Sequence, residues 1–338
     1  MPSSLRKKLL IGGGSVVGLV VVAVVAAPLF IDVNSYKPMI VSEVKAMTGR
    51  DLAIDGPISL SILPTPTVSV TGVKFSNVPG SKNASMVEMK SVTVKPSLLK
   101  LLTGGIEVSE VTLIEPKIVL EINAEGKPNW EFAPSVAEAK PVAPKPVSPK
   151  PLSLGRLTIE NGTLIFSDSK AGISVVADKA NFSASVGSID GPYTLAGGAD
   201  INGSPLKLDL AVGSKSSKGH NADVTLQAGG GKLTFRGTLS ELGPAARIAG
   251  VASVATDSLT GFVGTLVKLT GQPEPALPPL LAGKFVFDGA VEASQTAFAA
   301  KDFRMTLGQD SGSGSFAVTL KPTLAVDGKI AIPKLDLD

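Results

Sequence analysis

The sequence predicts a mainly β protein with one N-terminal transmembrane helix and few short helices. Residues 48–70, TGRDLAIDGPISLSILPTPTVSV, alternate apolar and polar side chains, and a period of two places alternate residues on opposite faces of a strand. Apolar residues make up 43% of the chain but aromatic residues only 4%, so we expect a mainly aliphatic core. The 36 glycines and 25 prolines fit many short strands joined by turns.

The first element is an uncharged apolar run over residues 9–31, which includes Leu9, Val20 and Ile31. As a helix rising ~1.5 Å per residue, this run is long enough to span a hydrocarbon core of ~30 Å. A cleaved signal peptide is the alternative, with cleavage near residues 26–27. The run exceeds the usual h-region of ~7–15 residues, and Pro28 is badly placed for cleavage, so we favour an uncleaved anchor.

Basic residues set the predicted orientation of this anchor. Arg6, Lys7 and Lys8 precede the apolar run. The positive-inside rule therefore places the N-terminus in the cytoplasm and everything after Asp32 on the far side of the membrane.

Four segments are expected along the chain. They are a cytoplasmic stub and anchor (1–31), a short helix plus β domain (32–133), a Pro/Lys-rich linker (134–151) and a second β region (152–338) with a helical insert at about 257–281. In the first β domain, Asn34 is expected to cap a helix that stops at Gly49. The linker lacks apolar periodicity and is rich in prolines without amide donors, which predicts an extended chain.

Two Asn-Gly pairs predict hairpins in the second β region. Asn161-Gly162 suits a two-residue type I′ turn that would set Ile159 opposite Leu164 and Leu157 opposite Phe166. Asn202-Gly203 would likewise align residue 199 with 206 and residue 195 with 210. Both registers place apolar residues together on one face.

The chain offers little for catalysis or cofactor binding. It has no cysteine and one histidine, His220, which lies in a polar stretch and is expected in an exposed turn. A zinc site of nitrogen or sulfur ligands and a Ser-His-Asp triad are therefore not expected. The acidic residues alternate with apolar ones, as on the solvated face of strands, and no P-loop occurs. We expect a non-enzyme with no catalytic residue, no cofactor and no metal, and the net charge of +3 gives no reason to expect nucleic acid as a partner.

Several stretches in order resemble the AsmA family of bacterial envelope proteins. They are the apolar run followed by DVNSYKPMIVSEVKAMTGRDLAIDGPISLSILPTPTVSV, the block LLKLLTGGIEVSEVTLIEPKIVLEINAEGKPNW, and the C-terminal helix and closing strands. Thr48, Gly49 and Arg50 match one family pattern; Gly126, Asn129 and Trp130 match another. The resemblance implies a single-pass inner-membrane protein of a Gram-negative bacterium with most of its chain in the periplasm. It also implies kinship with TamB and chorein-type proteins, and so an elongated antiparallel, half-open β groove thought to carry phospholipid between membranes.

A sheet with one apolar face must cover it with helices, a second sheet or a ligand. Two amphipathic helical segments are too few for so many strands, so the sheet either closes on itself or curls into a trough for a greasy ligand. The first hypothesis is that the protein binds or conducts lipid acyl chains toward the outer membrane in envelope biogenesis. The alternative is a non-enzymatic tether or factor for outer-membrane protein assembly, with a closed β core. Membrane lipids are the expected partners, together with outer-membrane or periplasmic proteins. The residues expected to line a lipid groove are Leu52, Ile54, Ile58, Leu60, Ile62, Val68, Val70, Leu157, Ile159, Leu164 and Phe166.

Overall fold

The computed structural model describes residues 32–97, 107–132, 154–188, 190–243, 245–272, 276–319 and 325–332. The predicted anchor, its three flanking basic residues and the linker at 134–151 lie outside these residues. Within the described ranges, no helix has both the length and the apolar character that crossing a membrane requires. The chain divides into two compact units: unit 1 is Met1–Ile114 with Phe132–Val142, and unit 2 is Glu115–Glu131 with Ala143–Asp338.

The described part of unit 1 begins with a short helical segment. A 3₁₀ turn, η2 (Val33–Tyr36), leads into α2 (Lys37–Thr48), which ends at Gly49 with a left-handed φ of 72°. Asn34 does not cap the helix as predicted: it lies inside η2, which Asp32 caps by accepting a bond from the Asn34 backbone amide, and the N-cap residue of α2 is Tyr36. The Asn34 side chain accepts from Ile58 N at 2.9 Å and donates to Ile58 O at 3.3 Å, so it fastens the helical segment to a strand.

An antiparallel sheet follows in unit 1. Its strands are β1 (Leu52–Ile54), β2 (Ile58–Ser61), β3 (Thr67–Ser76), β4 (Ser85–Pro96) and β5 (Val108–Ile114). Both β1 and β2 pair with β3, and β4 lies between β3 and β5. The long alternation at 52–70 is therefore three strands, with an interruption at residues 55–57 where the register against β3 shifts by one residue.

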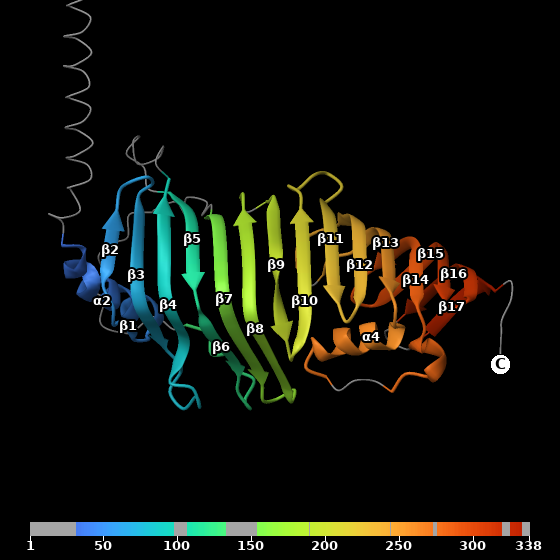
Figure 1. The fold of residues 1–338 in the computed structure, drawn as a ribbon, viewed down its shortest axis with the longest axis horizontal. Coiled ribbons are helices and arrows are strands. Elements are labelled where there is room, and N and C mark those ends of the chain that lie inside the picture. Colours follow the sequence, from blue (N-terminus) through green and yellow to red (C-terminus); the bar gives the residue numbers. More distant parts are fainter. Residues whose placement is uncertain are drawn as a thin grey trace, which may run out of the picture. The chain divides into compact units, whose positions relative to one another are not determined.

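Unit 2 is one large, mainly antiparallel sheet (Figure 1). It starts with β6 (Lys117–Ile122), which runs parallel to β7 (Leu154–Asp168). Each later strand then pairs antiparallel with the one before it. These strands are β8 (Ile173–Val186), β9 (Tyr193–Ile201), β10 (Ser204–Val212), β11 (His220–Ala228), β12 (Gly231–Leu239), β13 (Ile248–Thr256), β14 (Phe285–Ala293), β15 (Ala297–Leu307), β16 (Asp310–Thr319) and β17 (Ala325–Ala331).

The helical insert of unit 2 contains α4 (Leu259–Lys268) and a 3₁₀ turn, η3 (Pro279–Ala282). Ser258 caps α4 through a bond from Gly261 N to its side chain. In Figure 1, α4 crosses the ends of β11–β13. The mainly β architecture with few helices is thus confirmed within the described residues.

The two predicted hairpins have different outcomes. Asn202-Gly203 forms the β9–β10 turn, with Ala199 opposite Leu206 and Leu195 opposite Leu210, as predicted. The prediction of a hairpin at Asn161-Gly162 is wrong, because β7 continues through these two residues as one strand. Asn161 adopts a left-handed φ of 52° inside a β-bulge rather than in a chain reversal.

Candidate functional site

The described residues offer no metal-ligating cluster to build a site on. Among the residues described, no group of three or more His, Asp or Glu side chains lies close enough to hold a metal. His220 is not in an exposed turn as predicted; it is the first residue of β11, is 3% exposed and has Nδ1 2.9 Å from Gly213 O. The candidate site is instead formed by the apolar side of each sheet.

In unit 1, the predicted lining residues lie opposite other apolar residues. Leu60 faces Val68, and the row continues to Val94 and Val111. A second row joins Ile58, Val70, Val92 and Leu113. Directly opposite residues share one face of a sheet, so these rows form a continuous aliphatic surface across β2–β5. Apart from Ile58, these side chains are only half-buried.

Of the other predicted residues of unit 1, Leu52 and Ile54 precede the register shift and Ile62 lies after β2. Leu52 faces Phe75 and Ile54 faces Val73, while Ile62 follows the end of β2. Phe75 makes an edge contact with Phe132, at 5.8 Å between ring centroids.

Arg50, from the Thr-Gly-Arg pattern, lies beside the Phe75–Phe132 pair. Its guanidinium is 5.0 Å from the centre of the Phe132 ring and its Nη1 is 3.5 Å from Met86 S. Burial lowers the pKa of Arg50 from its ordinary value, but guanidinium stays protonated in proteins. Through these two contacts, Arg50 links Phe132 to Met86 of β4.

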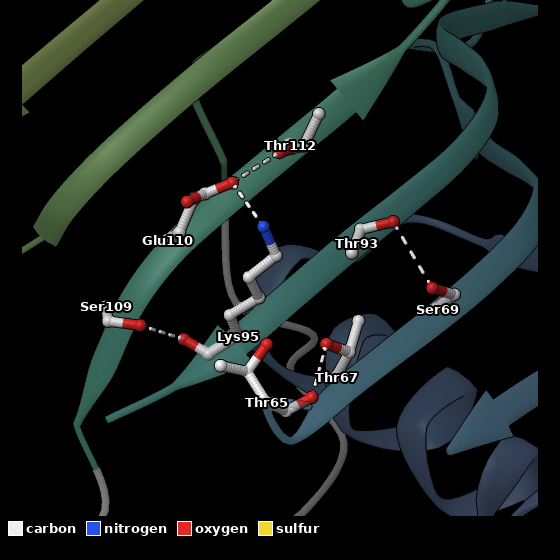
Figure 2. A network of polar contacts seen from close by, with 8 residues as sticks. All are labelled: Thr65, Thr67, Ser69, Thr93, Lys95, Ser109, Glu110 and Thr112. Carbon is white, nitrogen blue, oxygen red and sulfur yellow. Dashed lines mark hydrogen bonds and ion pairs between the residues drawn. The ribbon is translucent and has the colours of Figure 1, made fainter. Parts of the chain in front are cut away.

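The opposite face of β3–β5 carries polar contacts (Figure 2). Ser69 and Thr93 are adjacent to Val70 and Val92, and their hydroxyls lie 3.3 Å apart. Lys95 Nζ donates to Glu110 Oε1 at 2.9 Å, and Thr112 donates to the same oxygen at 3.3 Å. The sheet of unit 1 is thus two-sided, with aliphatic side chains on one face and hydroxyl and charged groups on the other.

In unit 2, one apolar row crosses eight strands. Leu157 faces Ala184, and the row continues through Leu195, Leu210, Val224, Phe235, Ala252 and Gly289. A neighbouring row runs from Ile159 through Phe182, Gly197, Leu208, Leu226 and Leu233 to Val254. Adjacent residues on the other face form exposed ion pairs such as Arg236–Asp223 and Lys301–Glu292.

All four predicted lining residues of β7 reach this apolar side. Ile159 faces Phe182, and both Leu164 and Phe182 pack against the cluster of Ala177, Ala180 and Ala199. The bulge at Asn161 changes the parity of the strand, so odd positions before it and even positions after it share one side. The predicted hairpin placed them together for the wrong reason.

The Gly-Asn-Trp pattern organises the edge next to β7. Asn129 is 2% exposed; its Oδ1 accepts from Glu121 N at 3.0 Å and its Nδ2 donates to Val119 O at 2.9 Å. This side chain therefore hydrogen-bonds to the backbone of β6 as a neighbouring strand would. It holds Trp130 with its ring 6.4 Å from that of Phe166.

Sequence reasoning missed most of the rows. Leu195 and Leu210 follow directly from the Asn202-Gly203 register and belonged among the lining residues. Val224 and Phe235 were also within reach, because Gly229-Gly230 is a two-residue turn that sets Ala228 opposite Gly231 and Val224 opposite Phe235. Phe182 needed the register of β8, which no turn signal used in the sequence analysis supplied.

Comparison with known proteins gives one match. The model of the AsmA family matches residues 3–301. No curated protein and no solved structure matches the chain.

Proposed function

The chain belongs to the AsmA family, and on that premise we propose that it is an inner-membrane-anchored, periplasm-facing protein of envelope biogenesis. Its role is to bind or conduct lipid acyl chains on the apolar side of its sheets, toward the outer membrane. The role is non-enzymatic and needs no cofactor. The segment at 9–31 serves as the anchor, with Arg6, Lys7 and Lys8 on the cytoplasmic side.

One observation carries this proposal: the apolar rows have large aliphatic side chains that the described protein leaves partly exposed. Leu60, Val68 and Val94 in unit 1 and Leu157, Leu195 and Leu210 in unit 2 are all half-buried. An apolar side of this extent is expected to be covered by a partner or ligand.

The energetics suit an acyl chain. A chain of about sixteen carbons gains roughly 12 kcal/mol on leaving water, at about 0.8 kcal/mol for each buried methylene. An aliphatic sheet face offers a similar gain to the bilayer interior, so a lipid would exchange between them at little net cost. Such contacts are non-directional and need no specific polar group, which fits rows of leucine, isoleucine and valine.

The space also fits. Strands of nine residues such as β9 and β10 extend about 30 Å at ~3.3 Å per residue. One leaflet contributes about half of a hydrocarbon core of ~30 Å, so a fatty tail is shorter than the strands that would hold it.

The test uses the full chain in its membrane. A photo-crosslinking amino acid is placed at Leu60 or Leu195, and for matched controls at the neighbouring Ser59 or Ala196, which are exposed on the opposite face. We expect phosphate-bearing lipid adducts at Leu60 and Leu195 only. Absence of adducts at both apolar positions would overturn the proposal and favour the closed-core assembly factor.

A further inference from the structure

The apolar side of unit 2 changes character between β9 and β10. On β7–β9, the buried apolar residues among those described are all alanines: Ala177, Ala180 and Ala199. The larger side chains there are half-buried. From β10 onward large side chains are buried as well, with Leu206 8%, Val212 6%, Phe235 9%, Val291 5% and Phe303 1% exposed.

Aromatic rings fill the apolar side of β14–β16. The Phe303 ring lies 5.7 Å from that of Phe287 and 5.6 Å from that of Phe316. Phe316 in turn lies 5.8 Å from Phe298. These spacings are those of directly packed aromatic pairs, so the four rings form one continuous cluster.

Two glycines that face each other allow β12 and β13 to approach closely. Gly237 on β12 lies opposite Gly250 on β13, and a β-carbon added at Gly237 would lie 2.7 Å from the Gly250 α-carbon. Only residues without side chains allow this approach, and glycine pairs of this kind mark tight bends in sheets. Val212 and Ala222 on one flank and Val291 and Ala300 on the other belong to a single buried cluster.

Helix α4 covers the end of the same strands. Its Phe262 is 3% exposed and its ring lies against Gly231, where β12 begins. The row at this level, Ala228, Gly231 and Thr256, is buried. The helix is tied at its C-terminal end by Asn202, whose Nδ2 donates to Lys268 O at 2.9 Å.

From these contacts we infer that β10–β16 together with α4 form the closed end of the acyl-chain path in unit 2. Acyl chains occupy the aliphatic surface of β7–β9 and stop at the buried cluster that begins on β10. This inference rests on the proposed function and divides its surface into an open aliphatic part and a sealed aromatic part. Lipid that reaches the boundary must therefore leave sideways or return.

A crosslinking scan of the full chain in its membrane tests the division. The crosslinker is placed at Ile159 and Leu195 in the open part, and at Val254 and Met305 in the sealed part. These four positions all lie on the apolar side. We expect phospholipid adducts at the first pair of positions and none at the second pair. Comparable adducts at all four positions would overturn the inference but leave the proposed function standing, whereas adducts at none would overturn the function itself.

A second experiment opens the seal. Phe316→Ala and Phe298→Ala remove half-buried rings from the cluster, and Val251→Ala, whose side chain is 57% exposed, is the control. With the crosslinker at Met305, we expect an adduct to appear in the two phenylalanine variants and not in the control. Labelling at Leu195 in the same variants checks that they fold. If variants that label at Leu195 stay unlabelled at Met305, the aromatic cluster is not the stop.

Discussion

Asn202 in the β9–β10 turn joins β8 to α4 through one amide: its Oδ1 accepts from Val176 N and its Nδ2 donates to Lys268 O, both at 2.9 Å. Asn202 has a left-handed φ of 48°, which glycine also adopts freely. Asn202→Gly therefore keeps the turn and removes both side-chain bonds. We expect the free energy of unfolding to fall by about 1 kcal/mol and amide exchange to quicken at the end of α4.

Urea denaturation and hydrogen exchange of the amides of Leu269 and Gly271 measure these effects. Asn202→Asp is the control, because it keeps the acceptor for Val176 and loses only the donor to Lys268. Unchanged exchange in Asn202→Gly would show that the amide does not hold the helix.

The bulge at Asn161 is the second point that sequence changes can probe. Asn161 has a φ of 52°, its amide donates to Asn181 Oδ1 at 2.9 Å, and a β-branched side chain is strained at this φ. Asn161→Val is expected to destabilise the protein by about 1–3 kcal/mol, whereas Asn161→Gly should be nearly neutral. Urea midpoints compare the two, and equal midpoints would argue against a required left-handed residue.

These two asparagines show how far the sequence predicts the fold. An Asn-Gly pair signals a left-handed residue, and at residues 202–203 it correctly predicted both the turn and the register. At residues 161–162 the same signal serves a bulge in β7, and β8 has a left-handed residue of its own, Lys179, in the next irregularity of the same strand pair. Nothing in the sequence around Lys179 signals that conformation, so the pairing of two bulged strands was not predictable.

The candidate site was predictable to a similar extent. Alternation identified the apolar residues of β1, β2 and β3, since that pattern is local to each strand, whereas those of β7 were selected through a hairpin that does not form. The cluster of Phe287, Phe303 and Phe316 depends on registers across three strands and on bulges within them. His220 was misplaced because its polar neighbours outweighed its position at the start of a strand.

A charge introduced on the apolar face of unit 1 should affect both the stability of the protein and its function, and the two effects can be measured separately. Leu60→Asp places a carboxylate among Val68 and Val94 and is expected to cost about 1–3 kcal/mol, while Ser59→Asp on the exposed opposite face should stay within about 0.5 kcal/mol. Cells that express Leu60→Asp at normal levels should have a more permeable envelope. Normal permeability in those cells would count against a lipid-facing surface.

The Lys179–Asp200 ion pair is expected to make a pH-dependent contribution to the free energy of unfolding. Lys179 Nζ donates to Asp200 Oδ2 at 2.7 Å, and this bond and the carboxylate charge raise the pKa of Lys179. A raised folded pKa adds stability that is complete below the unfolded pKa of about 10.4 and is lost as the pH rises through the folded pKa. Lys179→Met should therefore lower the urea midpoint slightly at neutral pH, with no difference once the pH exceeds the folded pKa.

Because both partners are exposed to water, the same difference should shrink in about 1 M salt. A difference that persists unchanged at high pH and high salt would mean that Lys179 acts through packing of its alkyl chain rather than through its charge.

Trp130 gives a direct optical test of the edge beside β7. It is the chain's one tryptophan, so the tryptophan emission comes from this indole alone, whose ring lies 6.4 Å from that of Phe166. Asn129→Ala removes both side-chain bonds to β6 and should lower the free energy of unfolding by about 1–3 kcal/mol. Without that anchor the indole becomes more hydrated, and its native-state emission should shift to longer wavelength. Lys127→Ala, an exposed change in the same turn, should alter neither quantity, and an unshifted Asn129→Ala spectrum would show that Asn129 does not position the indole.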